Sequence, residues 1–161
     1  MIRPKLFMMI GAPYSGKSTW AQNLKRSFPR TILVSSDAYI EATSRELGLT
    51  YSEVFEGAYP AAEKSMMQDV KLASSSLRDA VWDQTNLTVR SRAKKLAMFP
   101  DIYTKIAVLM PLLTDQELEE RMARRVDKII GLNIVRRMMR TMEVPTTAEG
   151  FDTIISAERA Q

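Results

Sequence analysis

Short apolar runs recur along the chain and predict the buried strands of a parallel sheet. They cover residues 5–10, 31–34, 80–83 and 102–110. Compact runs of this kind, rich in β-branched and other apolar residues, are typical of strands that are covered on both faces. Segments with a helical spacing of apolar residues lie between them. The pattern therefore predicts an α/β protein with a mostly parallel sheet of four or five strands.

The helical segments between the early strands predict scaffold. Helices are predicted over residues 19–28 and 38–47. Residues 49–55 are predicted to form a loop or a short helix, which Gly57 and Pro60 separate from a longer helix. The apolar face of that longer helix has spacings of three or four residues and consists of Ala62, Met66, Val70, Ala73 and Leu77. We interpret this face as packing surface without a chemical role.

Two consecutive amphipathic helices with basic faces are predicted toward the carboxyl end. A capping box of Thr114 and Glu117 begins the first helix, and Gly131 separates it from the second. The first helix presents three basic residues on one face: Arg121, Arg125 and Lys128. Its neighbouring apolar stripe consists of Leu118, Met122 and Val126. In the second helix the residues predicted to face inward are Ile134, Met138 and Met142, and those on an outer side are Arg136, Arg137 and Arg140.

These basic faces have two interpretations. Residues 121–140 contain seven basic residues and one acid, which as a solvated surface would serve solubility. In a phosphate-transferring protein the region around 114–131 would instead form a lid that brings an arginine to the transferring phosphate. The second basic face, with Arg137, could follow a nucleic-acid backbone. A further basic helix over residues 88–98 is interpreted as a solvated face.

Residues 11–19, GAPYSGKST, supply the clearest chemistry in the sequence. They match the phosphate-binding loop GxxxxGK[ST], and they lie between an apolar strand and a helix, as that motif requires. The backbone amides of such a loop cradle phosphates, Lys17 reaches the β and γ phosphates, and Ser18 can bind Mg²⁺. The predicted nucleotide-binding residues are Gly11, Ala12, Pro13, Tyr14, Ser15, Gly16, Lys17, Ser18 and Thr19. The predicted cofactors are ATP, or another nucleoside triphosphate, and Mg²⁺.

Two aspartates follow strands on the edge where α/β proteins bind ligands. Asp37 is either the cap of the helix after the second strand or a catalytic carboxylate, and the sequence supports both. Asp83 ends the third strand, where it would bind Mg²⁺ opposite the phosphate loop or lie in a surface turn. Thr85 and Asn86 place further hydrogen-bonding groups on the same edge.

Composition narrows the chemistry. The 161 residues, expected to form one domain, contain neither cysteine nor histidine, and the net charge is +4. Disulfides, thiolate metal sites and a histidine base are thereby excluded, which leaves a carboxylate or a lysine as base and a hard metal ion held by oxygen. No apolar run approaches the ~20 residues that span a bilayer, and the N-terminus does not resemble a signal peptide. The cytoplasm is the expected location.

Several motifs occur here in the order found in a known kinase family. They are GKSTWA at residues 16–21, SDAY at 36–39, TNL at 85–87 and the arginine-bearing lid. Over nearly its full length the chain resembles the 5′-kinase domain of bacteriophage polynucleotide kinase. Through further motifs at residues 50–55, 82–87 and 149–152 it is similar to a wider group of small P-loop kinases. The resemblance implies a three-layer α/β/α sandwich with a helical lid.

The resemblance also implies a reaction, the transfer of the γ-phosphate of a nucleoside triphosphate to a 5′-hydroxyl of DNA or RNA. It makes Asp37 the general base, and it places Lys17 and Ser18 on the phosphates and Mg²⁺. Arg121 and Arg125 become lid arginines on the donor phosphates. The catalytic residues implied are thus Lys17, Asp37 and Arg125, and those on the acceptor side are Asp37, Thr85, Asn86 and Arg137. The metal ligands implied are Ser18 and Asp83.

Three hypotheses remain open at this point. The first is a kinase for the 5′-hydroxyl end of a nucleic acid. The second keeps the chemistry but changes the acceptor to a hydroxymethylated base in DNA or a small metabolite, because Ile40 stands where the phage enzyme has an arginine. The third is a non-catalytic module that binds nucleotide and RNA or a protein. The sequence makes no prediction about donor preference or oligomeric state.

Overall fold

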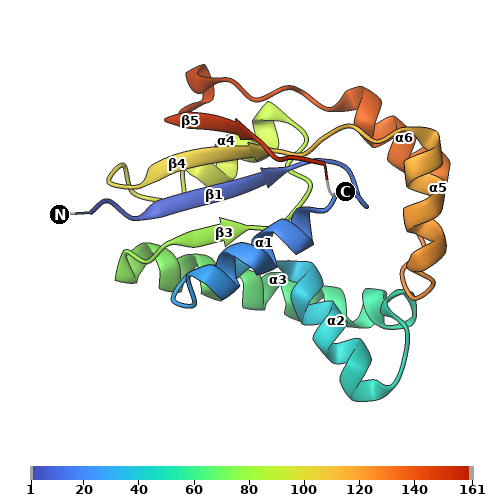
Figure 1. Cartoon of the computed structure of the whole chain (residues 1–161). Coiled ribbons are helices and arrows are strands. Elements are labelled where there is room, and N and C mark those ends of the chain that lie inside the picture. Colours follow the sequence, from blue (N-terminus) through green and yellow to red (C-terminus); the bar gives the residue numbers. More distant parts are fainter. Residues whose placement is uncertain (1, 160–161) are drawn as a thin grey trace.

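The computed structural model describes residues 2–159, and its centre is a five-stranded sheet in the order β2-β3-β1-β4-β5 (Figure 1). Every neighbouring pair is parallel. The strands are β1 Lys5–Ile10, β2 Ile32–Val34, β3 Ala80–Trp82, β4 Thr104–Leu109 and β5 Thr153–Ser156. The predicted α/β fold with a parallel sheet is therefore confirmed, with boundaries that differ by a few residues.

Helices cover both faces of this sheet. They are α1 Lys17–Ser27, α2 Ser36–Leu47, α3 Tyr51–Ser76, α4 Val89–Leu96, α5 Asp115–Arg124 and α6 Leu132–Thr141, followed by the 3₁₀ turn η1 Thr147–Glu149. On one face, strand residues pack with α1 through Ala21. On the other face, they pack with α3 and α4 through Met66, Val70 and Leu96. Alternate strand residues, such as Met8 and Met9, enter opposite cores, as the period of a strand requires.

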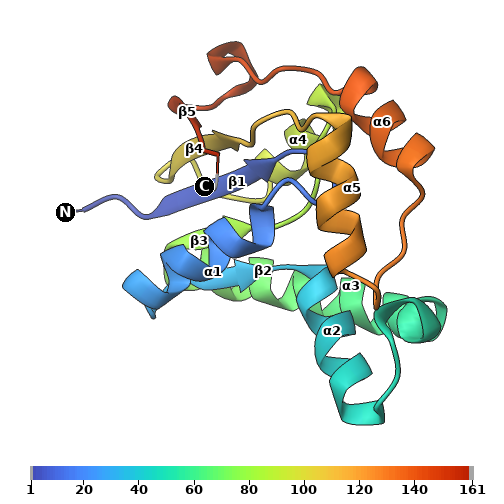
Figure 2. The same cartoon turned by 45° about the vertical axis from the view of Figure 1, so that its right-hand side comes forward.

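The parallel arrangement gathers the functional segments at one edge. Met8, Val34 and Trp82 are register partners across β1, β2 and β3, so these three strands end side by side. The phosphate loop follows β1, α2 follows β2, and Asp83 follows β3. Helices α5 and α6 stand beyond this edge, away from the amino end of the sheet (Figures 1 and 2).

Helix α3 is longer than the sequence pattern predicted. It runs without interruption for 26 residues and contains both Gly57 and Pro60, so the predicted break at these residues is wrong. A capping box at Thr50 begins the helix, and Val54 and Ala58 pack on α2. This packing outweighs the local cost of glycine and proline, because tertiary burial commonly overrides propensity. Four predicted members of the apolar face, Ala62, Met66, Val70 and Ala73, are buried, whereas Leu77 lies beyond the helix and is 45% exposed.

Two predicted helix faces are also corrected. In α6 the buried residue is Val135, packed against Leu118 of α5, whereas Ile134 is 43% exposed. The other two residues predicted to face inward, Met138 and Met142, are partly buried. Helix α5 ends at Arg124, so Val126 lies outside its apolar stripe and is exposed. The inward direction depends on where the two helices lie against the phosphate loop, which the apolar spacing alone does not specify.

The carboxyl-terminal segment docks on the sheet. Phe151 is buried in the core of the α3 face, and Ile154 packs beside it. The following residues form β5, which pairs with β4 at the edge of the sheet. Within residues 2–159, no helix has both the length and the apolar character required to cross a membrane.

Candidate active site

The phosphate loop connects β1 to α1, and two glycines permit its path. Gly16 caps the amino end of α1 with φ of 97°, in the left-handed region that glycine tolerates best. At Gly11 a Cβ atom would lie 2.7 Å from the Cβ of Met110 and 2.8 Å from Ser15 Oγ. The Gly11 amide also donates a 3.0 Å hydrogen bond to the Thr85 carbonyl, which ties the loop to the segment after β3.

The loop fits a polyphosphate. Helices α2, α3, α4 and α5 begin with a Ser or Thr side chain that caps a backbone amide, but α1, like α6, has no side-chain cap. Its first-turn amides and the positive end of its dipole are therefore available to an anion. Lys17 lies beside them, and its Nζ donates a 2.7 Å hydrogen bond to the Ala12 carbonyl. Burial lowers the pKa of Lys17 to about 8, against the opposing effect of Asp83.

Ser18 and Asp83 form a pair of oxygen groups suited to Mg²⁺. The Ser18 hydroxyl donates a 2.8 Å hydrogen bond to Asp83 Oδ2, and Asp83 is 7% exposed. Burial raises the pKa of Asp83, more than Ser18 and Lys17 lower it, so a bound cation would relieve a desolvated carboxylate. Among residues 2–159, no cluster of three or more metal-binding side chains exists. The pair fits Mg²⁺, which is commonly held by few protein ligands together with phosphates and water.

Asp37 faces the same cavity from the first turn of α2. Ser35, not Asp37, caps this helix, because its hydroxyl accepts the Ala38 amide. The Asp37 carboxylate accepts a 2.5 Å hydrogen bond from the Tyr51 hydroxyl and a 2.7 Å bond from Lys128 Nζ. Burial raises the pKa of Asp37, but Lys128 and Tyr51 outweigh it and leave the pKa below its ordinary value. The carboxylate is thus ionised at neutral pH.

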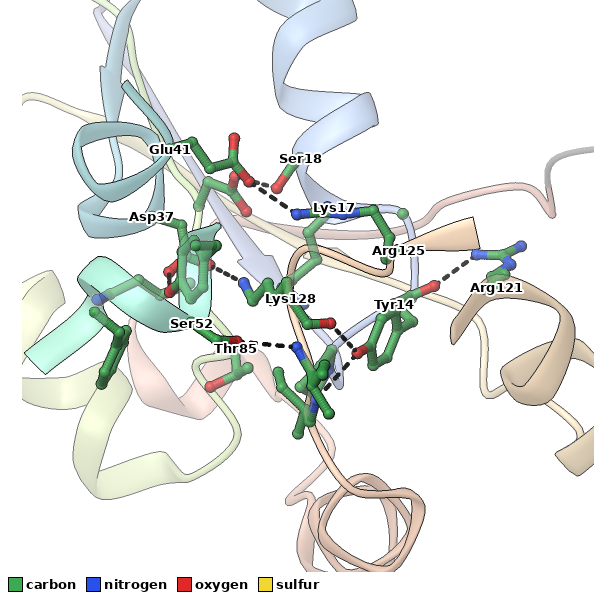
Figure 3. Close-up of a pocket in the computed structure, with 18 of the residues that line it drawn as sticks. Tyr14, Lys17, Ser18, Asp37, Glu41, Ser52, Thr85, Arg121, Arg125 and Lys128 are labelled. Atoms are coloured by element: carbon green, nitrogen blue, oxygen red, sulfur yellow. Dashed lines mark hydrogen bonds and ion pairs between the residues drawn. The ribbon is translucent and has the colours of Figure 1, made fainter. Parts of the chain in front are cut away.

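Both predicted lid arginines reach the cavity from the end of α5. Arg121 donates a 2.8 Å hydrogen bond to the Tyr14 carbonyl in the phosphate loop (Figure 3). Arg125 forms ion pairs with Asp127 at 3.2 Å and with Glu41 of α2 at 3.3 Å. Arg121 therefore contacts the phosphate loop, whereas Arg125 extends from the end of α5 toward α2.

The segment from Arg125 to Ile130 closes over the loop and α3. The Tyr14 hydroxyl donates a 3.0 Å hydrogen bond to the Lys128 carbonyl and accepts the Ile130 amide at 3.3 Å (Figure 3). The Ser52 hydroxyl accepts the Ile129 amide at 3.2 Å. The lid segment consequently bridges the two sides of the site.

These groups line one cavity of about 780 Å³. Its lining includes the following predicted residues: Pro13, Tyr14, Gly16, Lys17, Ser18, Thr19, Asp37, Asp83, Thr85, Arg121 and Arg125. The predicted site residues that the cavity lining does not include are Gly11, Ala12, Ser15, Asn86 and Arg137.

Asn86 has a structural environment. It is 2% exposed with φ of 49°, and its Nδ2 donates a 2.7 Å hydrogen bond to the Met9 carbonyl. Its Oδ1 accepts from Lys95. Asn86 therefore braces the turn after β3 and does not face the cavity. Arg137 is exposed on α6 and also lies outside the cavity lining.

Sequence reasoning missed three residues of the site. Lys128 was noted only as part of a basic face, and Tyr51 and Glu41 were not singled out. A lysine that pairs with Asp37 across 91 positions of sequence gives no local signal. The tyrosine is likewise brought to Asp37 only by the packing of α3 on α2.

Comparison with known proteins places the chain in a family. A family model described as the AAA domain matches residues 6–147. Heterogeneous nuclear ribonucleoprotein U-like protein 2 of Mus musculus is 23% identical over 160 residues, which are 96% of this chain and 22% of that protein. The chain thus spans about a fifth of the length of this curated relative.

Solved structures with a similar fold include several described as kinases. A candidate kinase from Chloroflexus aurantiacus has a TM-score of 0.63 and 18% identity, over 98% of this chain and 86% of that one. A chain of the Pnkp1/Rnl/Hen1 RNA repair complex has a TM-score of 0.64 and 18% identity, over 88% and 44% of the two chains. A gluconokinase from Sinorhizobium meliloti has a TM-score of 0.58 and 16% identity, over 100% and 86%. The chain therefore belongs to the AAA domain family and has a P-loop kinase-like fold.

Proposed function

We propose that this protein is an ATP-dependent kinase that phosphorylates the 5′-hydroxyl end of a DNA or RNA strand. The observation that supports it is the content of one cavity. A phosphate loop with the Ser18–Asp83 pair lines one part of it, and an ionised Asp37 lines another. Cationic lid groups lie between them. A hydroxyl at Asp37 and a phosphate at Lys17 would thus share one cavity.

On the donor side, the loop amides and Lys17 hold the β and γ phosphates, and Arg121 approaches the loop from the lid. Ser18 and Asp83 would hold Mg²⁺, which when bound supplies positive charge to the phosphate oxygens. Arg125 stabilises the charge that spreads over the transferring group once it exchanges its carboxylate partners for phosphate oxygens.

On the acceptor side, Asp37 accepts the proton of the attacking hydroxyl. The acceptor oxygen forms a bond to the γ phosphorus, and the bond between that phosphorus and the β–γ bridging oxygen breaks, releasing ADP. Tyr51 and Lys128 hold the carboxylate in place and keep it ionised. Asp37 remains 40% exposed, so an acceptor can reach it without disrupting both partners.

The nucleic-acid acceptor is supported by the motif resemblance and by the similarity in fold to a chain of an RNA repair complex. A second candidate, a small hydroxylated acceptor, is favoured by another observation. Three carboxylates, Glu41, Glu53 and Glu56, line the cavity that Asp37 enters, and carboxylates bind hydroxyls but repel phosphates. Ile40 is apolar and buried between α2 and α3, so this position supplies no cation to the cavity.

A panel assay with γ-labelled ATP tests the proposal. The acceptors are single-stranded oligonucleotides with a free 5′-hydroxyl, DNA containing hydroxymethyluracil, nucleosides, gluconate and other small polyols, and water alone. We expect label at the 5′ end of the oligonucleotide. Label on an internal base or on a polyol would show instead that the acceptor is a hydroxymethylated base or a small metabolite. ADP binding without transfer to any acceptor would favour a non-catalytic nucleotide-binding module.

A further inference from the structure

We propose that the groove between α3 and α4 binds the acceptor strand beyond its 5′ end, and that it takes single-stranded nucleic acid. The inference rests on the proposed function and specifies its substrate class. It names a second binding surface, separate from the groups that touch the reacting atoms.

The groove is a second cavity that adjoins the first. It has a volume of about 480 Å³ and lies between Tyr59 and Met67 of α3 on one side and Lys94 of α4 and Met98, just beyond α4, on the other. Gln84 lines both cavities. Its side chain is fixed at this junction, because its Oε1 accepts hydrogen bonds from Trp82 and Lys95 and its Nε2 donates to Ser36. A chain that leaves Asp37 past Gln84 therefore enters the groove.

The groove has an excess of positive charge. Arg90, Lys94 and Lys95 of α4 line it, and the single acid among the described lining residues is Glu63 of α3. Arg90 and Lys94 are exposed and are one helical turn apart. In the part of the chain that the structure describes, neither forms an ion pair. Two unpaired cations at the rim of a groove suit the phosphates of a strand.

An aromatic row on α3 connects this groove to the reacting end. Tyr51, which holds Asp37, is followed at intervals of four residues by Phe55 and Tyr59. The ring centroids are 5.7 Å and 5.3 Å apart along the row. Phe55 lines the first cavity and Tyr59 lines the second, and they are 38% and 37% exposed.

Aromatic platforms beside a basic groove are the common means of binding single strands without sequence preference. Unpaired bases can stack on the rings of Phe55 and Tyr59 while the backbone passes Arg90 and Lys94. The acids of the first cavity do not contradict this path, because a terminal 5′-hydroxyl carries no phosphate on its own oxygen. The charge of the groove favours a nucleic acid over an apolar protein segment.

Binding of a labelled 12-nucleotide single strand, DNA or RNA, tests the groove without relying on activity. We expect the double variant Arg90→Ala/Lys94→Ala to bind about tenfold more weakly than wild type. Its slope of log Kd against log salt should fall by about 1.4, at about 0.7 for each phosphate contact on a single strand. Tyr59→Ala should also weaken binding by at least about fivefold, and Tyr59→Phe, which keeps the ring, should restore it.

The matched control removes two exposed arginines at the far end of α1, Arg26→Ala/Arg30→Ala, and should leave Kd and salt slope as in wild type. The variant Arg137→Ala/Arg140→Ala tests the competing surface on α6. If this variant loses more affinity for the single strand than Arg90→Ala/Lys94→Ala does, the strand binds at α6 and the proposal is overturned. If Arg26→Ala/Arg30→Ala weakens binding as much as Arg90→Ala/Lys94→Ala does, the loss of affinity reflects net charge alone, and the proposal is overturned as well.

Transfer kinetics then separate this inference from the proposed function. With a 12-nucleotide acceptor, Arg90→Ala/Lys94→Ala should raise KM about tenfold at unchanged kcat, while KM for a dinucleotide acceptor stays as in wild type. Equal effects on both acceptors would refute the groove but leave the kinase intact. Oligonucleotide binding at the groove without any transfer would refute the kinase but support the groove. If the wild-type protein binds no oligonucleotide, or binds a peptide in the groove instead, the proposal that the groove binds nucleic acid is refuted.

Discussion

The surroundings of Asp37 determine what chemistry this residue can perform. A general base must be ionised and must be held within reach of its substrate. Lys128 and Tyr51 provide both conditions, because one compensates the charge and the other fixes the geometry. Lys128 lies 91 positions away and Tyr51 lies on the next helix, so the low pKa of Asp37 is a property of the assembled site.

Replacing the carboxylate tests this role. Asp37→Asn should lower kcat by about 10²- to 10⁴-fold, the usual contribution of a positioned base, because the amide cannot accept the proton. ADP affinity, measured with a fluorescent analogue, should change little. A variant with wild-type kcat would remove Asp37 from the mechanism. Tyr51→Phe serves as a finer probe: without its hydroxyl the pKa of Asp37 rises, and the acid limb of the rate profile should move to higher pH.

Arg125 is expected to act on the transition state and not on nucleotide binding. Arg125→Ala should reduce kcat by ~10³-fold while ADP binding remains measurable. Arg124→Ala is the matched control, because this neighbour lines the same cavity but is exposed and forms no ion pair among the described residues. It should change kcat by less than about tenfold. Equal activity of the Arg125 and Arg124 variants would show that lid charge, not a specific arginine, is what matters.

Lys17 should make nucleotide affinity depend on pH. Burial lowers its pKa to about 8 in the free protein, so the ammonium is present below that pH and is lost above it. ADP affinity should therefore be constant below pH 8 and fall by up to about tenfold per pH unit above it. Burial also lowers the pKa of Lys95 to about 8. The fall in ADP affinity above pH 8 should persist in Lys95→Gln. If it disappears in that variant, Lys95 and not Lys17 causes it.

At the scale of elements, α4 is only in part the solvated basic helix that its composition indicates, because Arg90 and Lys94 are exposed but Arg92 is not. Arg92 is fully buried and pairs with Glu149 of η1 at 2.7 Å. It also donates hydrogen bonds to the carbonyls of Asn86 and Glu143. Arg92 therefore joins the turn after β3, helix α4 and the carboxyl-terminal segment. A charged residue in a basic run was interpreted as surface because its buried partner lies 57 positions away.

Removing one partner of this pair should be costly. Arg92→Met leaves Glu149 buried without its counter-charge, and the free energy of unfolding should fall by about 3–5 kcal/mol in urea titration. Arg90→Ala, on the exposed side of α4, should change it by less than about 0.5 kcal/mol. Burial raises the pKa of Glu149, but Arg92 and Thr146 outweigh it and lower the pKa. The stabilisation is thus present above the ordinary pKa of glutamate and is lost as pH falls below it.

At the scale of the whole molecule, nucleotide should couple the sheet edge to the lid. The loop, α2, α3 and the Arg125–Ile130 segment contact one another through the cavity, so ADP with Mg²⁺ binds only the folded assembly. At a concentration 100 times Kd it should raise the free energy of unfolding by about 2.7 kcal/mol. Lys17→Ala should abolish most of this gain. A gain that survives in this variant would place the nucleotide elsewhere.

Much of the donor side was predictable from local sequence. The strand before Gly11, the loop itself and the helix after it are contiguous, and loop geometry is specified by short-range sterics at Gly16. The acceptor side was predicted less completely. Asp37 and Thr85 reach the cavity as expected, but Asn86 turns inward to support β1, because its amide satisfies a buried carbonyl.

The sequence by itself determined the parallel α/β class, the phosphate loop, the Ser18–Asp83 pair and the capping box that begins α5. These features depend on the spacing of apolar residues, on the residue types in turns and on residues next to strand ends. Only the tertiary structure decided which groups surround Asp37, that Arg92 is buried, and that Gly57 and Pro60 lie within one helix. Those outcomes depend on charge pairs and packing between segments far apart in the chain, which local pattern does not encode.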